Sequence, residues 1–410
     1  MKILAYTSPA RGHLFPLVPI LDELARRGHA VAVRTLASQV GLLRERGLSA
    51  APIAPGIEAL SHDDFRGRTP PAKLKRAMGT FTARAPIEVD DLRAATAQEQ
   101  PDALLVDAMT WGATAAAQAW GGPWAQWMPY PLPASSRDVP PFGPGLKPAA
   151  GPLGRARDRA LRPLLVRSMA GAALPALNVT RRAAGVPPLT DPDGLFLGAP
   201  LLLYMTAEPL EYPRSDWPAS VRMVGPCAWD PPAAAPAWLE DIDGPLVLVS
   251  TSSEFQDDGR LVRTALDALA GEDVTVIATL PSAELTGPVP ANARVERFVP
   301  HGPILERAAC AITHGGAGAT QKALAAGVPV CVVPFGRDQL EVARRVEVAG
   351  AGSRLPAPRL NPRRLRAKVH EAMGRSAGAR RVAAGFAATG GAATAADALE
   401  ELAGASHPVS

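Results

Sequence analysis

Short apolar runs alternate with amphipathic stretches along the first half of the chain. Four apolar runs have the length and composition of buried strands, at residues 3–6, 30–35, 50–53 and 103–107. The stretches between and after them have the spacing of helices, at residues 16–27, 40–47 and 111–120. Pro16 and Gly28 are typical of the beginning and the end of the first of these helices. This alternation predicts a parallel sheet covered by helices.

The alternation restarts after a proline-rich segment at residues 225–236, which we interpret as a linker because proline continues neither a helix nor a sheet. Strands are predicted at residues 245–250, 273–279, 309–313 and 328–335, and helices at 259–270, 321–326 and 382–402. We therefore expect an α/β protein with two domains. The predicted parts are an N-terminal domain (1–215), a linker (216–244), a C-terminal domain (245–385), and a C-terminal helix and tail (386–410).

Two segments, at residues 61–86 and 129–176, lack the regular pattern of either element. Long irregular insertions in a compact domain are often functional, and loose surface packing is the alternative. We expect both segments to shape a binding pocket.

Composition and charge narrow the classes of function. Hydrophobic residues make up 47% of the 410 residues, which suffices for large cores, and the net charge is only +4. The basic residues form no dense run, so nucleic-acid binding is not expected. Cys227, Cys310 and Cys331 have neither metal-binding nor disulfide spacing. The N-terminus lacks the apolar core of a secretion signal, and no apolar run approaches about 20 residues, so we expect a cytoplasmic protein without a membrane span.

A glycine-rich turn separates the predicted strand 309–313 from the helix that follows it. The turn contains His314, Gly315, Gly316, Ala317, Gly318 and Thr320. Glycines let a ligand approach the backbone, and a helix start offers unpaired N–H groups and the positive end of the helix dipole. Such a turn suits a phosphate or diphosphate, with His314 and Thr320 as further donors. A tight turn that binds no ligand is the alternative.

Two polar side chains follow the next predicted strand, 328–335. Asp338 and Gln339 are suited to bind hydroxyl groups, and ligands of open α/β sheets lie at the carboxyl ends of strands. A diphosphate site beside a polyol site indicates a nucleotide sugar.

A histidine and an aspartate follow two strands of the predicted N-terminal sheet. His13 comes after the first strand, and Asp107 ends the strand 103–107. An imidazole can take a proton from an alcohol near neutral pH, and a carboxylate beside it fixes its tautomer. The alternatives are a structural histidine and an aspartate that caps the helix after it.

Two further stretches lie where a nucleoside diphosphate would extend. Ser252 and Ser253 close the strand 245–250 and can contact a diphosphate, or they cap the next turn. Phe298, Val299 and His301 follow another short strand and can hold a base by stacking and hydrogen bonds. A phenylalanine packed in the core is the alternative.

Together these motifs resemble those of the family-one glycosyltransferases, which use nucleotide sugars and have two facing Rossmann-like domains, the GT-B fold. The resemblance covers nearly the whole chain and is closest to actinobacterial enzymes that decorate antibiotics and other natural products. It rests on Gly12-His13-x-x-Pro16, Asp107, residues 298–301, 314–318 and 327–329, and Asp338-Gln339.

The resemblance implies a role for each motif. His13 would be the general base on the acceptor hydroxyl and Asp107 its partner. His314 and the glycine turn would hold the diphosphate. Phe298 matches the position where many members stack a Trp on the base. Asp338 and Gln339 match the pair that binds the hydroxyls of the sugar.

Some positions depart from the family pattern. His301 stands where UDP-sugar enzymes usually have Gln, and Lys322 stands where many of them have a Glu for the ribose hydroxyls. Val342-Ala343 replaces a frequent Asn-Ala, so one helix-capping or sugar contact is expected to be lost. The Phe-Val-Pro-His combination is similar to that of enzymes that use dTDP-deoxysugars, so we favour dTDP over UDP as the nucleotide.

The predicted function is an inverting, metal-independent sugar transfer without a cofactor, from a nucleotide-sugar donor to a hydroxyl of an apolar natural product. A nucleotide-sugar 2-epimerase and a non-catalytic auxiliary partner of a glycosyltransferase are the alternatives. The sequence leaves open whether the protein is a homodimer. The residues expected to suit an apolar aglycone are Trp124, Trp127, Met128 and Phe142.

Overall fold

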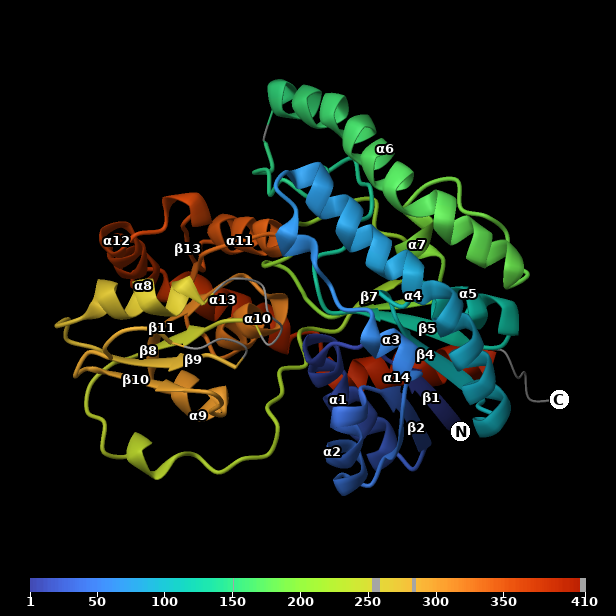
Figure 1. The fold of residues 1–410 in the computed structure, drawn as a ribbon, viewed down its shortest axis with the longest axis horizontal. Helices are drawn as coiled ribbons and strands as arrows, with labels where there is room; N and C mark the ends of the chain where they lie inside the picture. The colour runs from blue at the N-terminus through green and yellow to red at the C-terminus, as the bar shows by residue number, and fades with distance from the viewer. Residues whose placement is uncertain (150, 253–258, 282–284, 406–410) are drawn as a thin grey trace.

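The computed structural model describes residues 1–149, 151–252, 259–281 and 285–405. Within these residues the chain forms two parallel sheets, each covered by helices and joined by a long extended segment (Figure 1). The predicted α/β class with two parallel sheets is confirmed.

The first sheet is built from the N-terminal half of the chain. Its strands are β1 (Lys2–Tyr6), β2 (Ala30–Thr35), β3 (Ser49–Pro52), β4 (Ala103–Asp107), β5 (Trp124–Met128), β6 (Leu201–Tyr204) and β7 (Val221–Met223). Its helices are α1 (Arg11–Arg26), α2 (Val40–Glu45), α3 (Pro55–Ala59), α4 (Pro70–Glu99), α5 (Trp111–Trp120), α6 (Pro152–Ala183) and α7 (Gly194–Leu197). Short 3-10 turns lie at Ala37–Gln39 and Asp64–Arg66.

The second sheet follows the extended segment. Its strands are β8 (Leu246–Ser250), β9 (Thr275–Thr279), β10 (Ala293–Glu296), β11 (Ala308–Thr313), β12 (Val330–Val332) and β13 (Gly352–Arg354). The helices are α8 (Arg260–Leu269), α9 (His301–Leu305), α10 (Ala317–Ala325), α11 (Gln339–Val348), α12 (Pro362–Met373), α13 (Ser376–Ala387) and α14 (Gly391–Ala405). Further 3-10 turns lie at Ala237–Leu239 and Ala357–Arg359.

The strand order fixes where ligands can bind. The first sheet runs β3-β2-β1-β4-β5-β6-β7 and the second β10-β9-β8-β11-β12-β13. The order therefore reverses between β1 and β4 in one sheet and between β8 and β11 in the other. In open α/β sheets the crevice at such a reversal, beyond the carboxyl ends of the strands, is the ligand site.

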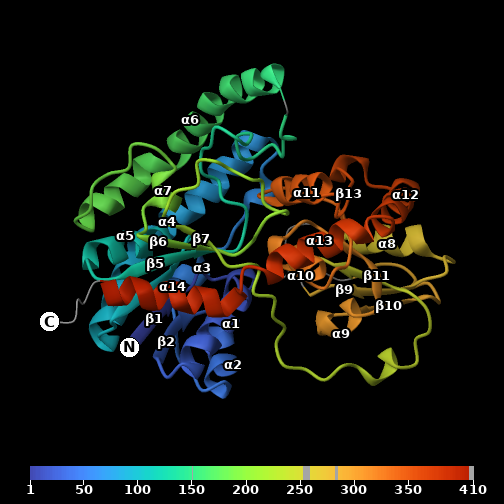
Figure 2. The same ribbon diagram turned by 180° about the vertical axis from the view of Figure 1, so that it is seen from behind.

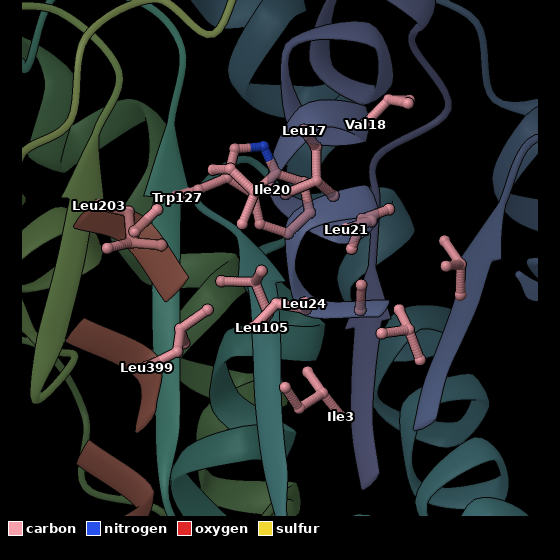
Figure 3. Packing of buried hydrophobic residues seen from close by; sticks show 14 of the residues in the cluster. Ile3, Leu17, Val18, Ile20, Leu21, Leu24, Leu105, Trp127, Leu203 and Leu399 are labelled. Atoms are coloured by element: carbon pink, nitrogen blue, oxygen red, sulfur yellow. The ribbon is translucent and has the colours of Figure 1, made fainter. Parts of the chain in front are cut away.

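Both faces of the first sheet are buried. Along β1, Ile3 and Leu4 belong to hydrophobic clusters on opposite faces, because successive side chains of a strand alternate. Figure 3 shows one cluster, in which Leu399 of α14 packs beside Leu105 and Leu203. The last helix of the chain thus lies against the first sheet, as Figure 2 shows from behind. None of the helices in the described part of the chain is both long and apolar enough to cross a bilayer.

The prediction that residues 61–86 and 129–176 are irregular is wrong over most of their length. Residues 70–99 form α4, and residues 152–183 form α6. Both helices contain internal prolines, and α6 is exposed along much of its length. The internal prolines were therefore misinterpreted as helix breaks. The apolar stripe of these helices was also too weak to predict a helix.

Three smaller corrections concern element boundaries. Helix α1 begins at Arg11 rather than Pro16, so Pro16 lies inside the helix. The predicted helix at residues 382–402 is two helices: α13 ends at Ala387, and α14 begins at Gly391, which has positive φ like Gly390 before it. Strand β7 belongs to the first sheet, although its residues fall in the range predicted as linker.

Candidate active site

A cleft of about 1340 Å³ separates the two sheets and is lined by residues from both. His13 after β1 and His314 after β11 lie on its walls, each beside the strand reversal of its own sheet. The cleft is therefore where the topology of both domains places a ligand.

The wall from the first domain carries a histidine–aspartate pair. His13 lies in the first turn of α1, and its Nδ1 is 2.9 Å from Oδ2 and 3.1 Å from Oδ1 of Asp107. Asp107 is fully buried and also accepts backbone N–H groups from Ser8 at 3.1 Å and Met109 at 2.9 Å. The contact between His13 and Asp107 is the predicted one, and the bond from Met109 shows that Asp107 also caps the turn after it.

The environment keeps this carboxyl group ionised. Burial acts to raise the pKa of Asp107, but the charge of His13 and its hydrogen bond, together with the bonds from Met109 and Ser8, hold that pKa below its ordinary value. A carboxylate at Nδ1 keeps the proton of a neutral imidazole on that nitrogen, so Nε2 carries the lone pair. The pair thus has the orientation of a general base.

The wall from the second domain carries the glycine turn. Gly315 has φ +94°, and His314 Nδ1 is 3.4 Å from the carbonyl oxygen of Ser250. A Cβ on Gly316 would lie 2.4 Å from His314 Nε2, so the imidazole lies directly over the turn. Ala317 begins α10, and the first turn of this helix contains no acidic residue. The N-terminus of α10 therefore presents unpaired N–H groups and positive potential to the cleft.

The predicted diphosphate residues do not all reach the cleft. Gly316, Ala317 and Gly318 line it, together with His314. Thr320 does not, because its side chain is fully buried and its hydroxyl is 2.9 Å from that of Thr313. The expectation that Thr320 donates to a phosphate is therefore wrong. Gly315 lies behind the lining residues, where its backbone N–H donates to Thr313.

The residues predicted to hold the base line the same cleft, as does Ser252, one of the two serines predicted to contact the diphosphate. Phe298 lines it with 54% of its surface exposed, so it is not the packed core residue of the alternative interpretation. Val299 and Ser252 also line the cleft and are buried, whereas Ser253 lies outside the described residues. His301 Nε2 is 3.2 Å from the hydroxyl of Thr279. Burial and then Lys322 lower the pKa of His301 to about 4, so its imidazole is neutral near pH 7.

The ion pair between Lys322 and Asp230, which lies beside His301, was not predicted. Lys322 of α10 bonds through its ammonium group to Asp230, which lies in the segment interpreted as a linker. Asp230 also accepts the backbone N–H of Gly302 at 3.0 Å. Helix α10, helix α9 and the extended segment therefore meet where Lys322 and His301 line the cleft. Sequence periodicity did not predict a role for Asp230, because the residues around it indicate only a proline-rich linker.

Asp338 and Gln339 lie at the start of α11, and both line the cleft. Gln339 Oε1 accepts the backbone N–H groups of Phe335 at 2.7 Å and Gly336 at 3.0 Å, so it also shapes the preceding loop. Burial raises the pKa of Asp338 above its ordinary value. The residue before them, Arg337, has φ +52° and binds Asp64 of the first domain at 2.7 Å.

An apolar region of the cleft lies in the first domain, partly on α4, which the sequence did not predict, and partly on the predicted helix α5. Phe81 of α4 lies 5.0 Å from the ring of Trp111 and 4.7 Å from that of His62, measured between centroids. All three residues line the cleft, as does Phe142, which was predicted. The cleft lining does not include Trp124, Trp127 or Met128, which are buried in β5, so that part of the aglycone prediction is wrong.

Among the described residues no group of three or more His, Cys, Asp or Glu side chains is arranged to hold a metal ion. His314, Lys322 and the N-terminal residues of α10 line the cleft.

Comparison with known proteins gives a consistent picture. Residues 263–402 match the family model described as "Erythromycin biosynthesis protein CIII-like, C-terminal domain". The chain is 34% identical over 385 residues to 4'-demethylrebeccamycin synthase of Lentzea aerocolonigenes, with 90% of each chain covered.

Two solved structures share the fold over nearly the whole length. The glycotransferase of kitacinnamycin superposes with a TM-score of 0.74 at 24% identity, covering 98% of both chains. The glycosyltransferase VinC, determined in complex with dTDP, superposes with a TM-score of 0.69 at 23% identity, covering 98% of this chain and 99% of VinC.

Proposed function

This chain belongs to the GT-B glycosyltransferases of antibiotic biosynthesis, and we propose that it transfers a sugar from a dTDP-sugar to a hydroxyl group of an apolar natural product. The observation that carries the proposal is that the His13–Asp107 pair and the N-terminus of α10 line one cleft from opposite domains. A sugar between them would have a base on one side and a diphosphate site on the other.

We propose a single displacement at the anomeric carbon. His13 Nε2 takes the proton of the acceptor hydroxyl while the acceptor oxygen forms a bond to the anomeric carbon. The bond from that carbon to the diphosphate oxygen breaks, and its electron pair leaves with the nucleotide. Attack from the face opposite the leaving group inverts the configuration.

The negative charge of the leaving group grows during this step. Backbone N–H groups at the start of α10 and the imidazole of His314 are placed to stabilise that charge electrostatically. This arrangement favours catalysis without a metal ion, which is part of the proposal.

The preference for dTDP rests on the nucleoside end of the cleft. A neutral His301 and the Lys322–Asp230 ion pair replace the residues that a UDP-sugar enzyme usually has there. The relative VinC binds dTDP in its crystal structure, which agrees with this preference. For the acceptor, the aromatic lining at Phe81 and Trp111 favours an apolar aglycone.

The test is a transfer assay with dTDP-hexose and UDP-hexose donors, a panel of apolar alcohols and phenols, and excess chelator. We expect a glycoside with inverted configuration by NMR, formed faster with dTDP-hexose and at an unchanged rate in chelator. Activity lost in chelator and restored by Mg²⁺ would refute metal independence. An epimerised donor in the absence of an acceptor would favour the 2-epimerase, which the relatives do not favour.

A further inference from the structure

His62 brings a polar side chain into the apolar region of the cleft. It lies between α3 and the short turn Asp64–Arg66, and its ring is 4.7 Å from that of Phe81 in an edge-on arrangement. Both rings line the cleft. The apolar side chains that line this region and pack into one cluster are Leu74, Met78, Phe81, Trp111, Met169 and Phe196. Such neighbours offer an imidazole no conventional hydrogen bond, and an unpaired polar group among them is costly.

Neither ring nitrogen of His62 has a hydrogen-bond partner within the described part of the chain. Nδ1 is buried, whereas Nε2 is accessible from the cleft that His62 lines. Trp111 Nε1 is also buried without a partner, but Trp111 is only 1% exposed. His62 is therefore an unpartnered polar group that a ligand in this region can reach.

The surroundings of His62 keep its imidazole neutral. Burial, followed by the positive charges of Arg337 and Arg84, lowers the pKa of His62 to about 3. A neutral imidazole carries one ring proton, and an orphaned buried N–H is rarer in proteins than an orphaned buried acceptor. The proton is therefore assigned to Nε2, so that His62 presents one hydrogen-bond donor to the cleft.

His62 also lies near the groups that the proposed reaction uses. Its ring is within electrostatic range of His13. Asp64, two residues further along the chain, binds Arg337 of the second domain at 2.7 Å, next to Asp338. An acceptor with its hydroxyl group at His13 and its apolar body against Phe81 would therefore lie beside His62.

Two guanidinium groups decide which chemistry suits the donor of His62. Arg337 and Arg84 are both within electrostatic range of the ring, so the local potential favours an electron-rich oxygen and disfavours a cation or a second N–H donor. A carbonyl oxygen fits, because it accepts a hydrogen bond and carries partial negative charge. A hydroxyl group fits less well, since its own proton would be buried among apolar side chains without a partner.

We propose that His62 determines acceptor specificity by donating a hydrogen bond from Nε2 to a carbonyl oxygen of the aglycone. The acceptor is then an apolar alcohol or phenol that also carries a ketone, quinone or amide carbonyl, rather than one with a plain hydrocarbon body. This inference rests on the proposed function and names the class of acceptor for the same cleft. It gives His62 no part in making or breaking bonds.

The test compares acceptors that differ only by a carbonyl group, namely the positional isomers of hydroxyfluorenone and the matching hydroxyfluorenes. His62→Phe keeps a ring beside Phe81 and removes the donor. For at least one hydroxyfluorenone it should lower kcat/KM by about 3–10-fold, the range of a neutral hydrogen bond. For the matching hydroxyfluorene it should leave kcat/KM within about twofold.

Further variants separate this role from packing. His62→Gln keeps an N–H donor and should preserve kcat/KM for the hydroxyfluorenone within about twofold. Phe81→Leu removes apolar contact from the body of either acceptor, so it should lower kcat/KM for both to a similar extent. His370→Phe changes an exposed histidine of α12 outside the cleft lining and should behave like the wild type. Circular dichroism checks that every variant is folded.

Binding of the same acceptors, measured by calorimetry, separates this inference from the proposed function. A wild-type chain that binds a hydroxyfluorenone through His62 but transfers no sugar would refute the proposed function alone. Sugar transfer in which His62→Phe affects every hydroxyfluorenone and its hydroxyfluorene equally would overturn the inference alone. A full loss in His62→Gln, or no binding of any hydroxyfluorenone by the wild-type chain, would overturn the inference as well.

Discussion

At the scale of single residues, each histidine in the cleft depends on a neighbour that sets its chemistry. Asp107 holds Nδ1 of His13 at 2.9 Å, so the lone pair of the neutral ring lies on Nε2. His301 lies where burial lowers its pKa to about 4, and it is therefore a neutral hydrogen-bonding group near pH 7. The same side chain is thus oriented as the proposed base at one position and is a neutral polar group at another.

The substitution His13→Ala tests the first of these roles. We expect the rate of transfer to fall by about 10²–10⁴, which is the usual contribution of a general base. Binding of dTDP, measured by calorimetry, should remain within about threefold, because His13 lies on the opposite wall. His370→Ala, an exposed histidine of α12, is the control and should behave like the wild type. Near wild-type turnover of His13→Ala would remove His13 from the mechanism.

A buried carboxyl group behind the pair predicts a pH dependence of stability. Burial raises the pKa of Glu88 to about 8, although Gly112 donates its backbone N–H to that carboxyl at 2.8 Å. The unfolded chain loses this proton near pH 4.5, while the folded chain keeps it up to about pH 8. The unfolded state therefore binds fewer protons in this interval, and the free energy of unfolding falls as the pH rises through it.

Glu88→Gln removes this contribution and keeps an oxygen to accept the bond from Gly112. The decrease in unfolding free energy between pH 5 and pH 8, measured by urea denaturation, should be smaller in the variant by a few kcal/mol, on the order of the shift in pKa. Equal slopes in the two proteins would show that Glu88 is ionised in the folded state.

At the scale of elements, the sequence predicts those with a clear repeat and misses those without one. The strands 30–35 and 103–107 and the helix 111–120 were predicted with their observed bounds, because apolar runs and periodicity are strong there. Helices α4 and α6 were missed, since internal prolines and exposed faces hide their pattern. The same holds for the candidate site: cleft residues that follow predicted strands were predicted, and cleft residues on α4 were not.

Contacts that depend on tertiary packing also could not be predicted from the sequence. The ion pair between Lys322 and Asp230 joins residues far apart in the chain, one of them in an irregular segment. Thr320 was misplaced because the pattern shows its distance from the turn but not the side of the helix that packs against Thr313. Spacing predicts which elements meet, and packing decides which side chains face the ligand.

The glycine turn gives a prediction at this scale. Gly316 has φ −61° and ψ 131°, which alanine adopts without strain, so the obstacle to a Cβ is the His314 ring at 2.4 Å. Gly316→Ala should displace the ring and weaken dTDP binding by roughly 10–100-fold, the loss expected for a charge-assisted hydrogen bond.

Gly41→Ala is the matched control for Gly316→Ala. Gly41 lies within α2, and a Cβ there meets no atom within 4 Å. This variant should bind dTDP like the wild type and be slightly more stable, because alanine favours the helix by about 0.5–1 kcal/mol. Unchanged dTDP binding by Gly316→Ala would show that His314 does not contact the diphosphate.

At the scale of the whole molecule, α11 connects the two domains beside the cleft that Asp338 and Gln339 line. Glu341 accepts backbone N–H groups of Gly143 at 2.8 Å and Gly145 at 2.9 Å, both from the first domain. Arg345 of α11 binds Glu211 of the first domain at 3.0 Å. Asp338 and Gln339 belong to the same helix start, so the first domain helps to position the residues proposed to bind the sugar.

The ion pair between Arg337 and Asp64 tests this coupling. Arg337 adopts φ +52°, an unfavourable conformation for arginine, and its 2.7 Å bond to Asp64 holds the loop before Asp338. In a double-mutant cycle with Arg337→Gln and Asp64→Asn, we expect kcat/KM for the donor sugar to show a coupling of about 0.5–3 kcal/mol.

The pair Arg263–Asp267 on α8, with a 2.6 Å separation, serves as the control cycle; Asp267 is exposed and Arg263 is partly buried. Arg263→Gln and Asp267→Asn should leave kcat/KM unchanged, because this pair lies away from the cleft lining. Additive losses at Arg337 and Asp64 would mean that the two residues act separately and that the ion pair does not position the sugar site.

The most direct measurement is a crystal structure of the His13→Ala variant with an intact dTDP-sugar and an acceptor. We expect the diphosphate at the N-terminus of α10 beside His314, and the acceptor hydroxyl next to the position of the missing imidazole, with the anomeric carbon between them. A diphosphate bound away from α10, or an acceptor that reaches the sugar from the side of the nucleotide, would contradict it.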